Sequence, residues 1–159
     1  MRLIKLALIS FIVLFGIITA MSLLIPAHIR ISKAVTISSN DSLFYLIKDT
    51  AQWPRWHPAF QGQKVTTVLQ QNHITTKTEV ESDTLVRMAW QQDGKLPVMN
   101  SWELHRFGTA DSVALQWYMD FHLKWYPWQK FGSMLYEKTY GTLMEQGLKN
   151  IKAIVEEKR

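Results

Sequence analysis

The side chains that could move a proton are few, and most of them fall on the face away from the predicted core. Asp120 and His122 are two residues apart on one predicted strand, so both side chains point to the same face of that strand. Trp117 and Phe121 have the opposite parity, so we expect the acid–base pair to be solvated and outside any cavity. His57 is then the remaining candidate for proton transfer to a ligand.

Other signatures of catalysis are missing from the sequence. The chain contains no Cys, and no pair of His residues has metal-ligand spacing together with a third ligand. It has neither a Gly-rich phosphate loop nor a Ser in a nucleophile elbow. We therefore expect no metal and no cofactor, and we favour a binding role over that of an enzyme.

The charge pattern bears on possible partners. The net charge of +5 comes from basic residues that are dispersed along the chain. No RNA- or DNA-binding motif is present, and the basic residues do not line one face of a predicted helix. Nucleic acid is therefore not an expected partner.

Aromatic side chains are the most unusual feature of the composition. Seven Trp, seven Phe and five Tyr make up 12% of the chain. In a domain this small they line either a packed core or a cavity, and both interpretations remain open. A cavity walled by rings and Met would suit a flat or flexible apolar ligand, because Met adapts its shape. The expected ligand-binding residues are Trp56, His57, Asn100, Trp102, Trp117, Met119, Phe121 and Met134.

Three of these residues have specific expected places. Trp56 belongs to a Pro-bounded segment that forms either the mouth of a cavity or a plug at its end. His57 is expected near that mouth. Asn100 shares its parity with Trp102 and so faces the interior, where a ligand oxygen or a neighbouring backbone group would be its partner.

The N-terminal region contains a run of twenty residues, Leu6 to Ile25, without a charge. A helix of that length covers about 30 Å, the thickness of the hydrocarbon core of a bilayer. We therefore predict a single membrane span, with an anchor at residues 1–26 and one domain at residues 27–159. The alternative is a secretory signal cleaved near Ala20 to Ser22, which would leave a hydrophobic stub.

The orientation of the span depends on a small charge difference. Arg2, Lys5 and the terminal amine precede the span, whereas Arg30 and Lys33 follow it, so the positive-inside rule gives nearly a tie. A short N-terminal tail stays most easily in the cytoplasm. We therefore predict a single-pass membrane protein whose C-terminal domain lies outside the cytoplasm.

Alternating and helical patterns divide the rest of the chain. Apolar residues from Ile29 to Ile37 alternate with polar ones and predict a first strand. Short helices are expected after the cap signal Ser39 to Asp41 and around Trp53 to Trp56. Turn residues that suit antiparallel neighbours separate further predicted strands at 64–71, 73–82, 84–92, 98–107 and 112–124.

From Pro127 to Glu157 the period of the apolar residues becomes helical. One helix of this length would extend about 45 Å and could cross a whole sheet. The predicted fold class is therefore α+β, with a curved antiparallel sheet of five to seven strands around a long C-terminal helix. One transmembrane helix precedes this domain.

Several local segments carry a likeness to a known superfamily: Ala34 to Ile37, Phe44 to Asp49, Trp53 to Pro58, and Gly147 to Lys152 with Glu156. Together with the order of elements, they resemble the START-like, or SRPBCC, superfamily of helix-grip proteins, which includes the birch pollen allergen. The bacterial group described as polyketide cyclase/dehydrase-like is the most similar, and some of its members have one N-terminal span. The likeness covers residues 24–157.

The resemblance implies the helix-grip fold but no single activity, because the superfamily contains lipid carriers, hormone receptors, cyclases and chaperone activators. We expect a membrane-anchored module that binds a lipid-like or other small apolar ligand between the sheet and the C-terminal helix. The alternatives are a polyketide cyclase- or dehydratase-like enzyme and a ligand-free protein-interaction domain. A solid core favours the interaction domain, an apolar cavity favours binding, and a cavity with converging titratable groups favours the enzyme.

Overall fold

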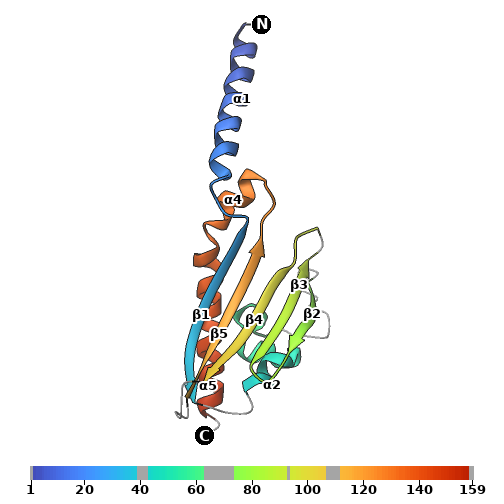
Figure 1. Ribbon diagram of the computed structural model, residues 1–159, viewed down its shortest axis with the longest axis vertical. Helices are drawn as coiled ribbons and strands as arrows, with labels where there is room; N and C mark the ends of the chain where they lie inside the picture. Colours follow the sequence, from blue (N-terminus) through green and yellow to red (C-terminus); the bar gives the residue numbers. More distant parts are fainter. Residues whose placement is uncertain (1, 39–42, 63–73, 93, 107–111, 158–159) are drawn as a thin grey trace.

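A curved antiparallel sheet forms the centre of the chain, and helices cover one of its faces (Figure 1). The computed structural model describes residues 2–38, 43–62, 74–92, 94–106 and 112–157. The five described strands are β1 (His28–Ser38), β2 (Ile74–Glu81), β3 (Leu85–Gln92), β4 (Val98–Arg106) and β5 (Ser112–His122). The strand predicted at 64–71 lies outside the described residues.

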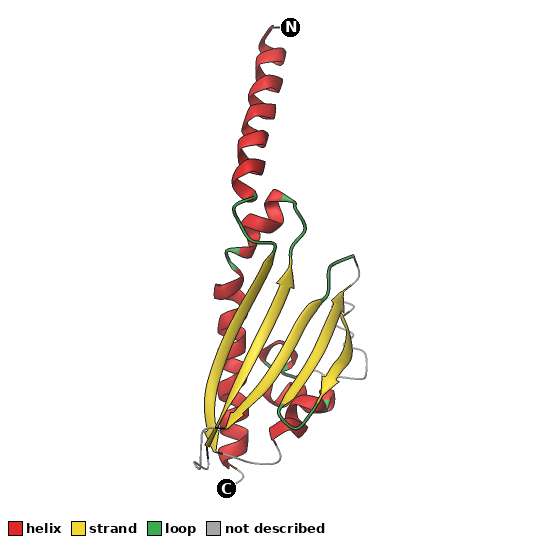
Figure 2. Ribbon diagram, viewed as in Figure 1, coloured by secondary structure: helices red, strands yellow, loops and turns green. Residues whose placement is uncertain are grey.

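The strands are ordered β1-β5-β4-β3-β2, and every neighbouring pair is antiparallel (Figure 2). The alternation in β5 has the expected consequence, because Trp117, Met119 and Phe121 all face the helices and are buried. Trp102 pairs directly with Trp117, and Asn100 pairs with Met119. The α+β class and the antiparallel sheet predicted from the sequence are confirmed.

Two short helices follow β1, as the sequence predicts. They are α2 (Leu43–Lys48) and α3 (Trp53–Trp56), with the 3₁₀ turns η1 (Thr50–Gln52) and η2 (Pro58–Phe60) after each. Two indole N–H groups tie α3 to the end of α2: Trp53 donates to the Ile47 carbonyl at 2.8 Å and Trp56 to the Leu46 carbonyl at 2.7 Å. These bonds satisfy indoles that would otherwise be buried without a partner.

The C-terminal helical region differs from the single continuous helix predicted from Pro127 to Glu157. It consists of α4 (Pro127–Ser133), a π-helical turn η4 (Glu137–Gly141) and α5 (Thr142–Glu157). At the break, the rings of Tyr136 and Tyr140 each lie 4.8 Å from the ring of Phe121. The π-helical turn thus occurs where Tyr136 and Tyr140, one turn apart, both place their rings against the sheet.

Lys33, which interrupts the apolar face of the first predicted strand, has a role in joining β1 to this region. Its ammonium group lies 2.7 Å from a carboxylate oxygen of Glu137 and 3.0 Å from one of Glu145. Because Lys33 lies opposite Trp117 in the register, it shares the helix-covered face of the sheet. Both carboxylates raise the pKa of Lys33, chiefly through hydrogen bonds, so the bridge keeps its charge at neutral pH.

The centre of the core is a cluster of four fully buried indoles, Trp53, Trp56, Trp102 and Trp117. The ring centroids of Trp102 and Trp117 are 5.3 Å apart, and those of Trp56 and Trp117 are 5.8 Å apart. Helix α5 lies close above them because Gly147 has no side chain at the point of contact. A Cβ at Gly147 would lie 3.0 Å from a ring carbon of Trp117. This half of the domain is a solid core.

The N-terminal helix α1 (Arg2–Ser22) extends beyond the domain and ends three residues before Ile25, where the predicted span ends. It is long and apolar enough to cross a membrane, a property that a signal sequence shares. The connection after it is fixed to the domain. The Lys130 ammonium donates to the Ile25 carbonyl at 2.7 Å, and the Leu123 amide donates to the Ala27 carbonyl at 2.7 Å.

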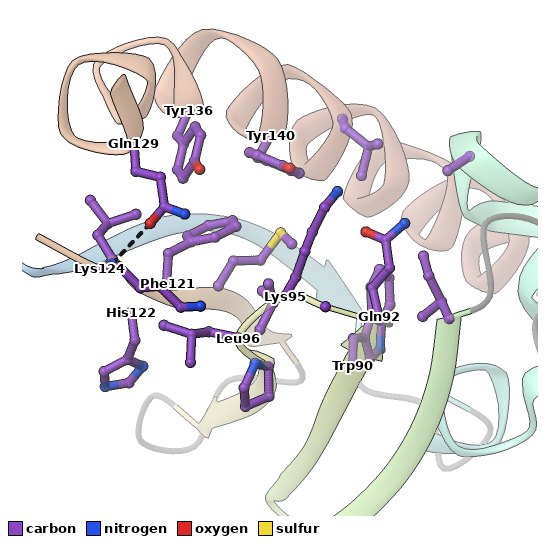
Figure 3. A pocket seen from close by; sticks show the side chains of 18 of the residues that line it. Trp90, Gln92, Lys95, Leu96, Phe121, His122, Lys124, Gln129, Tyr136 and Tyr140 are labelled. Carbon is purple, nitrogen blue, oxygen red and sulfur yellow. Dashed lines mark hydrogen bonds between the residues drawn. The ribbon is translucent and has the colours of Figure 1, made fainter. Parts of the chain in front are cut away.

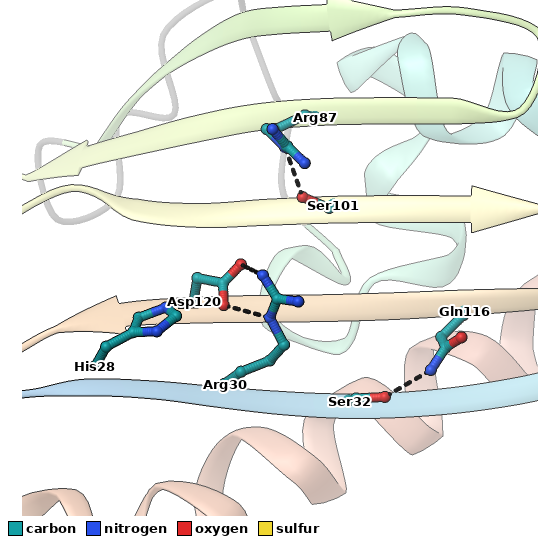
Figure 4. A network of polar contacts seen from close by, with 7 residues as sticks. All are labelled: His28, Arg30, Ser32, Arg87, Ser101, Gln116 and Asp120. Atoms are coloured by element: carbon teal, nitrogen blue, oxygen red, sulfur yellow. Dashed lines mark hydrogen bonds and ion pairs between the residues drawn. The ribbon is translucent and has the colours of Figure 1, made fainter. Parts of the chain in front are cut away.

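The opposite face of the sheet carries a polar network around Asp120 (Figure 4). Arg30 donates to both carboxylate oxygens, at 2.6 and 3.0 Å, and His28 Nε2 lies 3.1 Å from one of them. Burial alone would raise the pKa of Asp120, but the Arg30 and His28 contacts outweigh it and lower the pKa. The expectation that Asp120 is solvated is therefore wrong: its face was predicted correctly, but its cross-strand partners cover it.

Candidate ligand-binding pocket

A pocket of about 480 Å³ lies between the sheet and the C-terminal helical region (Figure 3). Phe121 and His122 reach it from β5, and Trp90 and Gln92 reach it from β3. His122 is exposed, as predicted, but the expectation that it lies outside any cavity is wrong, because it borders the edge of this pocket. Tyr136, Tyr140 and the beginning of α5 close it on the helical side, and the loop 94–97 borders it between β3 and β4. The break between α4 and α5 therefore lies directly over the pocket.

The inner walls are apolar and come from elements far apart in the sequence. Phe60, Trp90, Met119, Phe121 and Leu143 supply rings and aliphatic groups from η2, β3, β5 and α5. Burying apolar surface in such a space is worth about 25 cal/mol per Å², so an aliphatic or aromatic ligand would gain most of its affinity here. Directional contacts then have to come from the few polar groups in the lining.

Tyr136 and Tyr140 are two of these polar groups. Their rings lie 5.3 Å apart, edge to face, and both contact Phe121. Burial raises the pKa of Tyr140, and the neighbouring Tyr136 adds to the effect. The Tyr140 phenol therefore stays protonated at neutral pH and can donate a hydrogen bond.

The edge of the pocket carries cations. Lys95 and Lys124 are exposed lining residues, and His122 and Gln129 lie beside Lys124 (Figure 3). The Gln129 side chain fixes this corner, because its Oε1 accepts the Lys124 amide N–H at 2.9 Å. Among the residues that the structure describes, none in the lining is Asp or Glu. Lys95 and Lys124 therefore favour a neutral or anionic group over a cation beside them.

His57 lies in the pocket wall but is fully buried. Its Nδ1 accepts the amide N–H of Ala59 at 3.2 Å and so caps η2. Burial lowers the pKa of His57 to about 3, so the ring is neutral at physiological pH. With Nδ1 acting as acceptor, the remaining proton is assigned to Nε2.

Two N–H groups in the pocket lining have no hydrogen-bond partner among the described residues. They are His57 Nε2 and Trp90 Nε1, and their ring centroids lie 5.6 Å apart. A buried donor without an acceptor costs about 1–3 kcal/mol relative to a satisfied one. An oxygen atom of a ligand that reached this inner wall would remove that cost.

The structure divides the residues expected at the site into two groups. His57, Met119 and Phe121 line the pocket. The other buried candidates form the solid core beside it: Trp56, Asn100, Trp102 and Trp117.

Three candidates lie in surroundings that differ from the expectation. Asn100 Oδ1 accepts the Trp117 indole N–H at 3.2 Å, so its partner there is a side chain. Met134 is 70% exposed and is not one of the residues that line the pocket. His57 was expected near a mouth, but it belongs to the innermost part of the wall.

Several lining residues were missed by reasoning from the sequence. Trp90 lies on a predicted strand with no clear alternation, and the loop 94–97 had only a turn signal. Tyr136 and Tyr140 have helical spacing, which could have identified them as neighbours on one face. Nothing in the local pattern indicated that this face meets Phe121.

No sequence-family model matches the chain, and no curated protein matches it by sequence. Solved structures match its fold. A START superfamily protein from Mycobacterium smegmatis has a TM-score of 0.60 at 19% identity, covering 82% of this chain and 99% of that one.

Two polyketide aromatase/cyclases are also similar in structure. The Zhui aromatase/cyclase from Streptomyces sp. R1128 has a TM-score of 0.59 at 12% identity, covering 81% of this chain and 94% of that one. The di-domain ARO/CYC StfQ from the steffimycin biosynthetic pathway has a TM-score of 0.62 at 10% identity, covering 83% of this chain and 52% of that one. The chain therefore has the START-like helix-grip fold, as its sequence predicts.

Proposed function

We propose that this protein is a membrane-anchored binding module that holds a lipid-like molecule in the pocket beneath the C-terminal helical region. The observation that carries the proposal is the pocket itself, about 480 Å³ enclosed mainly by aromatic and aliphatic side chains. Its volume falls in the range of about 300–1,000 Å³ that small-molecule sites occupy. The length and apolar character of α1 support the anchor, and the domain lies outside the cytoplasm in this proposal.

The lining supports a particular arrangement of the ligand. Its apolar body would lie against the apolar side chains of Met119, Phe121 and Leu143. A neutral or anionic polar group would lie at the edge, beside Lys95 and Lys124. These two lysines have no ion-pair partner among the described residues, so no existing ion pair would have to break when the ligand binds.

A second candidate function is a cyclase-like reaction on a polyketide-type substrate, as the names of two structural neighbours suggest. The observation in its favour is His57 in the pocket wall. With a pKa of about 3 the ring is a poor base, although its neutral N–H could bond to a carbonyl oxygen. Because no carboxylate among the described lining residues completes an acid–base pair with it, binding is the better supported function.

Photo-crosslinking with a diazirine fatty acid tests the binding proposal in the full chain, held in lipid vesicles. We expect covalent adducts on peptides that contain the pocket residues Phe121, Tyr136 or Tyr140. Leu143→Trp places an indole in the pocket, and it should lower the yield of these adducts at least about tenfold, equivalent to about 1.4 kcal/mol of binding free energy.

Thr142→Trp is the matched control, because it adds the same indole at the neighbouring exposed position of α5. It should leave the yield of pocket adducts unchanged. Adducts confined to α1 in the wild-type chain, or pocket adducts that persist in Leu143→Trp, would contradict the proposal.

A further inference from the structure

Exposed hydrophobic side chains of the domain gather at the end nearest α1. Outside α1, ten large hydrophobic residues are exposed among those the structure describes. Seven of the ten lie in two short segments, 23–24 and 125–135. We call these seven the α4 patch: Leu23, Leu24, Trp125, Trp128, Phe131, Met134 and Leu135.

The distribution of polar and apolar residues on α4 is the reverse of that expected for a helix that faces water. Pro127, Lys130 and Ser133 are its buried residues, whereas Trp128 is 64% exposed. Phe131 follows Trp128 after three residues, so both side chains lie on one face of the helix. A helix that faces water buries its apolar face and exposes its lysines. The outward face of α4 is therefore suited to surroundings that are less polar than water.

Lys130, the buried lysine of α4, joins this helix to the segment that follows α1. Its ammonium donates to the Ile25 carbonyl at 2.7 Å, in the connection that follows α1. The Ser133 hydroxyl donates to the Lys130 carbonyl at 2.6 Å, and α4 packs against α1. These contacts hold the α4 patch beside the C-terminal end of α1 (Figure 1).

We infer that the α4 patch lies in the headgroup region of the bilayer that α1 spans. Trp and Tyr favour this depth, because their rings are amphipathic and match the boundary between hydrocarbon and water. The Tyr126 ring stacks on that of Trp128 at a centroid distance of 4.9 Å, and it contacts the Trp125 ring at 5.0 Å in a tilted arrangement. The inference rests on the membrane anchor in the proposed function, since α1 fixes which surface the patch meets.

The position of the patch has a consequence for the pocket. Gln129 of α4 and the neighbouring Lys124 are both pocket-lining residues (Figure 3). The edge of the pocket therefore lies at the membrane surface, with its lysines at the depth of lipid headgroups. A lipid-like ligand would enter from the bilayer itself, and it need not cross water.

Site-directed spin labelling can test this placement, because the natural chain has no Cys. The full chain is reconstituted in phosphatidylcholine vesicles with a single label at Phe131→Cys, and collisions with oxygen and with a water-soluble nickel chelate are measured. Tyr45→Cys on α2 is the matched control, since Tyr45 is 58% exposed, close to the 64% of Trp128, but α2 lies at the other end of the domain. Leu14→Cys reports on α1, and Trp128→Cys gives a second position on the α4 patch.

The inference predicts an oxygen-to-nickel collision ratio several-fold higher at Phe131→Cys and Trp128→Cys than at Tyr45→Cys. If Leu14→Cys shows lipid exposure but both α4 labels match Tyr45→Cys, the inference is wrong while the anchor stands. If Leu14→Cys is itself accessible to the nickel chelate, the anchor fails, and the inference fails with it. Dipolar broadening between α4 labels, lost on dilution with unlabelled chain, would show that a second copy covers the patch and would overturn the inference.

Discussion

His57 is an ionisable residue that is fully buried. Five aromatic rings surround its imidazole, with centroid distances between 4.6 and 5.9 Å. This enclosure explains the low pKa, because a protonated ring would lose its hydration without gaining a negative partner. His57 is therefore a neutral capping group for η2 and part of the pocket wall, and protonating it would destabilise the fold.

This environment makes stability depend on pH. In the unfolded chain His57 has its ordinary pKa of 6.5, whereas in the folded chain the pKa is about 3. Between these two values the unfolded chain binds a proton that the folded chain does not bind. Stability should therefore fall as the pH drops below 6.5, by up to about 1.4 kcal/mol per pH unit. Denaturant unfolding of the full chain in micelles between pH 7 and 4.5 measures this slope.

His57→Asn is the control for that slope, since the Asn Oδ1 can still cap η2 but does not titrate. The variant will be less stable at pH 7, because it leaves part of the ring volume empty. Its stability should nevertheless change less with pH than that of the wild-type chain. Equal slopes in the two proteins would show that His57 is not the titrating group.

At the scale of elements, the seating of α5 on β5 determines where the core ends and the pocket begins. Gly147 lets the helix approach Trp117, and Pro58 and Trp56 also lie within 4 Å of the position that a Cβ would occupy. Farther toward the N-terminal end of the helical region, Tyr136 and Tyr140 meet Phe121 around the pocket instead. One helical region thus covers a solid core at one end and a pocket at the other.

Two glycine substitutions separate the effect of close packing from that of helix propensity. Gly147→Ala should destabilise the chain by about 1–3 kcal/mol, because the new methyl group meets a fully buried indole. Gly132→Ala in α4 should be neutral or stabilise by up to about 1 kcal/mol, since nothing lies within 4 Å of its Cβ position. Denaturant unfolding measures both values. A cost at Gly132 as large as that at Gly147 would contradict this packing.

Most of the elements could be predicted from the sequence, because their signals are local. Strict alternation identified β5, and the change to a helical period identified the C-terminal region. The break at Glu137 to Gly141 was not predictable, because Gly132 and Gly141 are compatible with a continuous helix and the π turn depends on tertiary contact. The burial of Asp120 was missed for a similar reason, since Arg30 is ninety residues away in the sequence.

The whole molecule combines an N-terminal helix, a hydrogen-bonded joint and a domain whose pocket edge lies next to that joint. Lys130 and Leu123 fix the connection after α1, so the domain has a defined orientation relative to the helix. At this scale the sequence predicted the long apolar N-terminal helix and the fold, but it did not predict the location of the pocket. Parity showed which residues face inward, yet it could not show that Trp117 packs solidly while Met119 and Phe121 border empty space.

The central claim is that the pocket holds a lipid-like molecule in the native protein. Native mass spectrometry of the full chain, extracted from its own membranes in a mild detergent and released from the micelle in the gas phase, tests it most directly. We predict a population carrying one additional small molecule, reduced strongly in Leu143→Trp and retained in Thr142→Trp. A wild-type spectrum that shows only the bare chain, or an adduct equally abundant in Leu143→Trp, would contradict the claim.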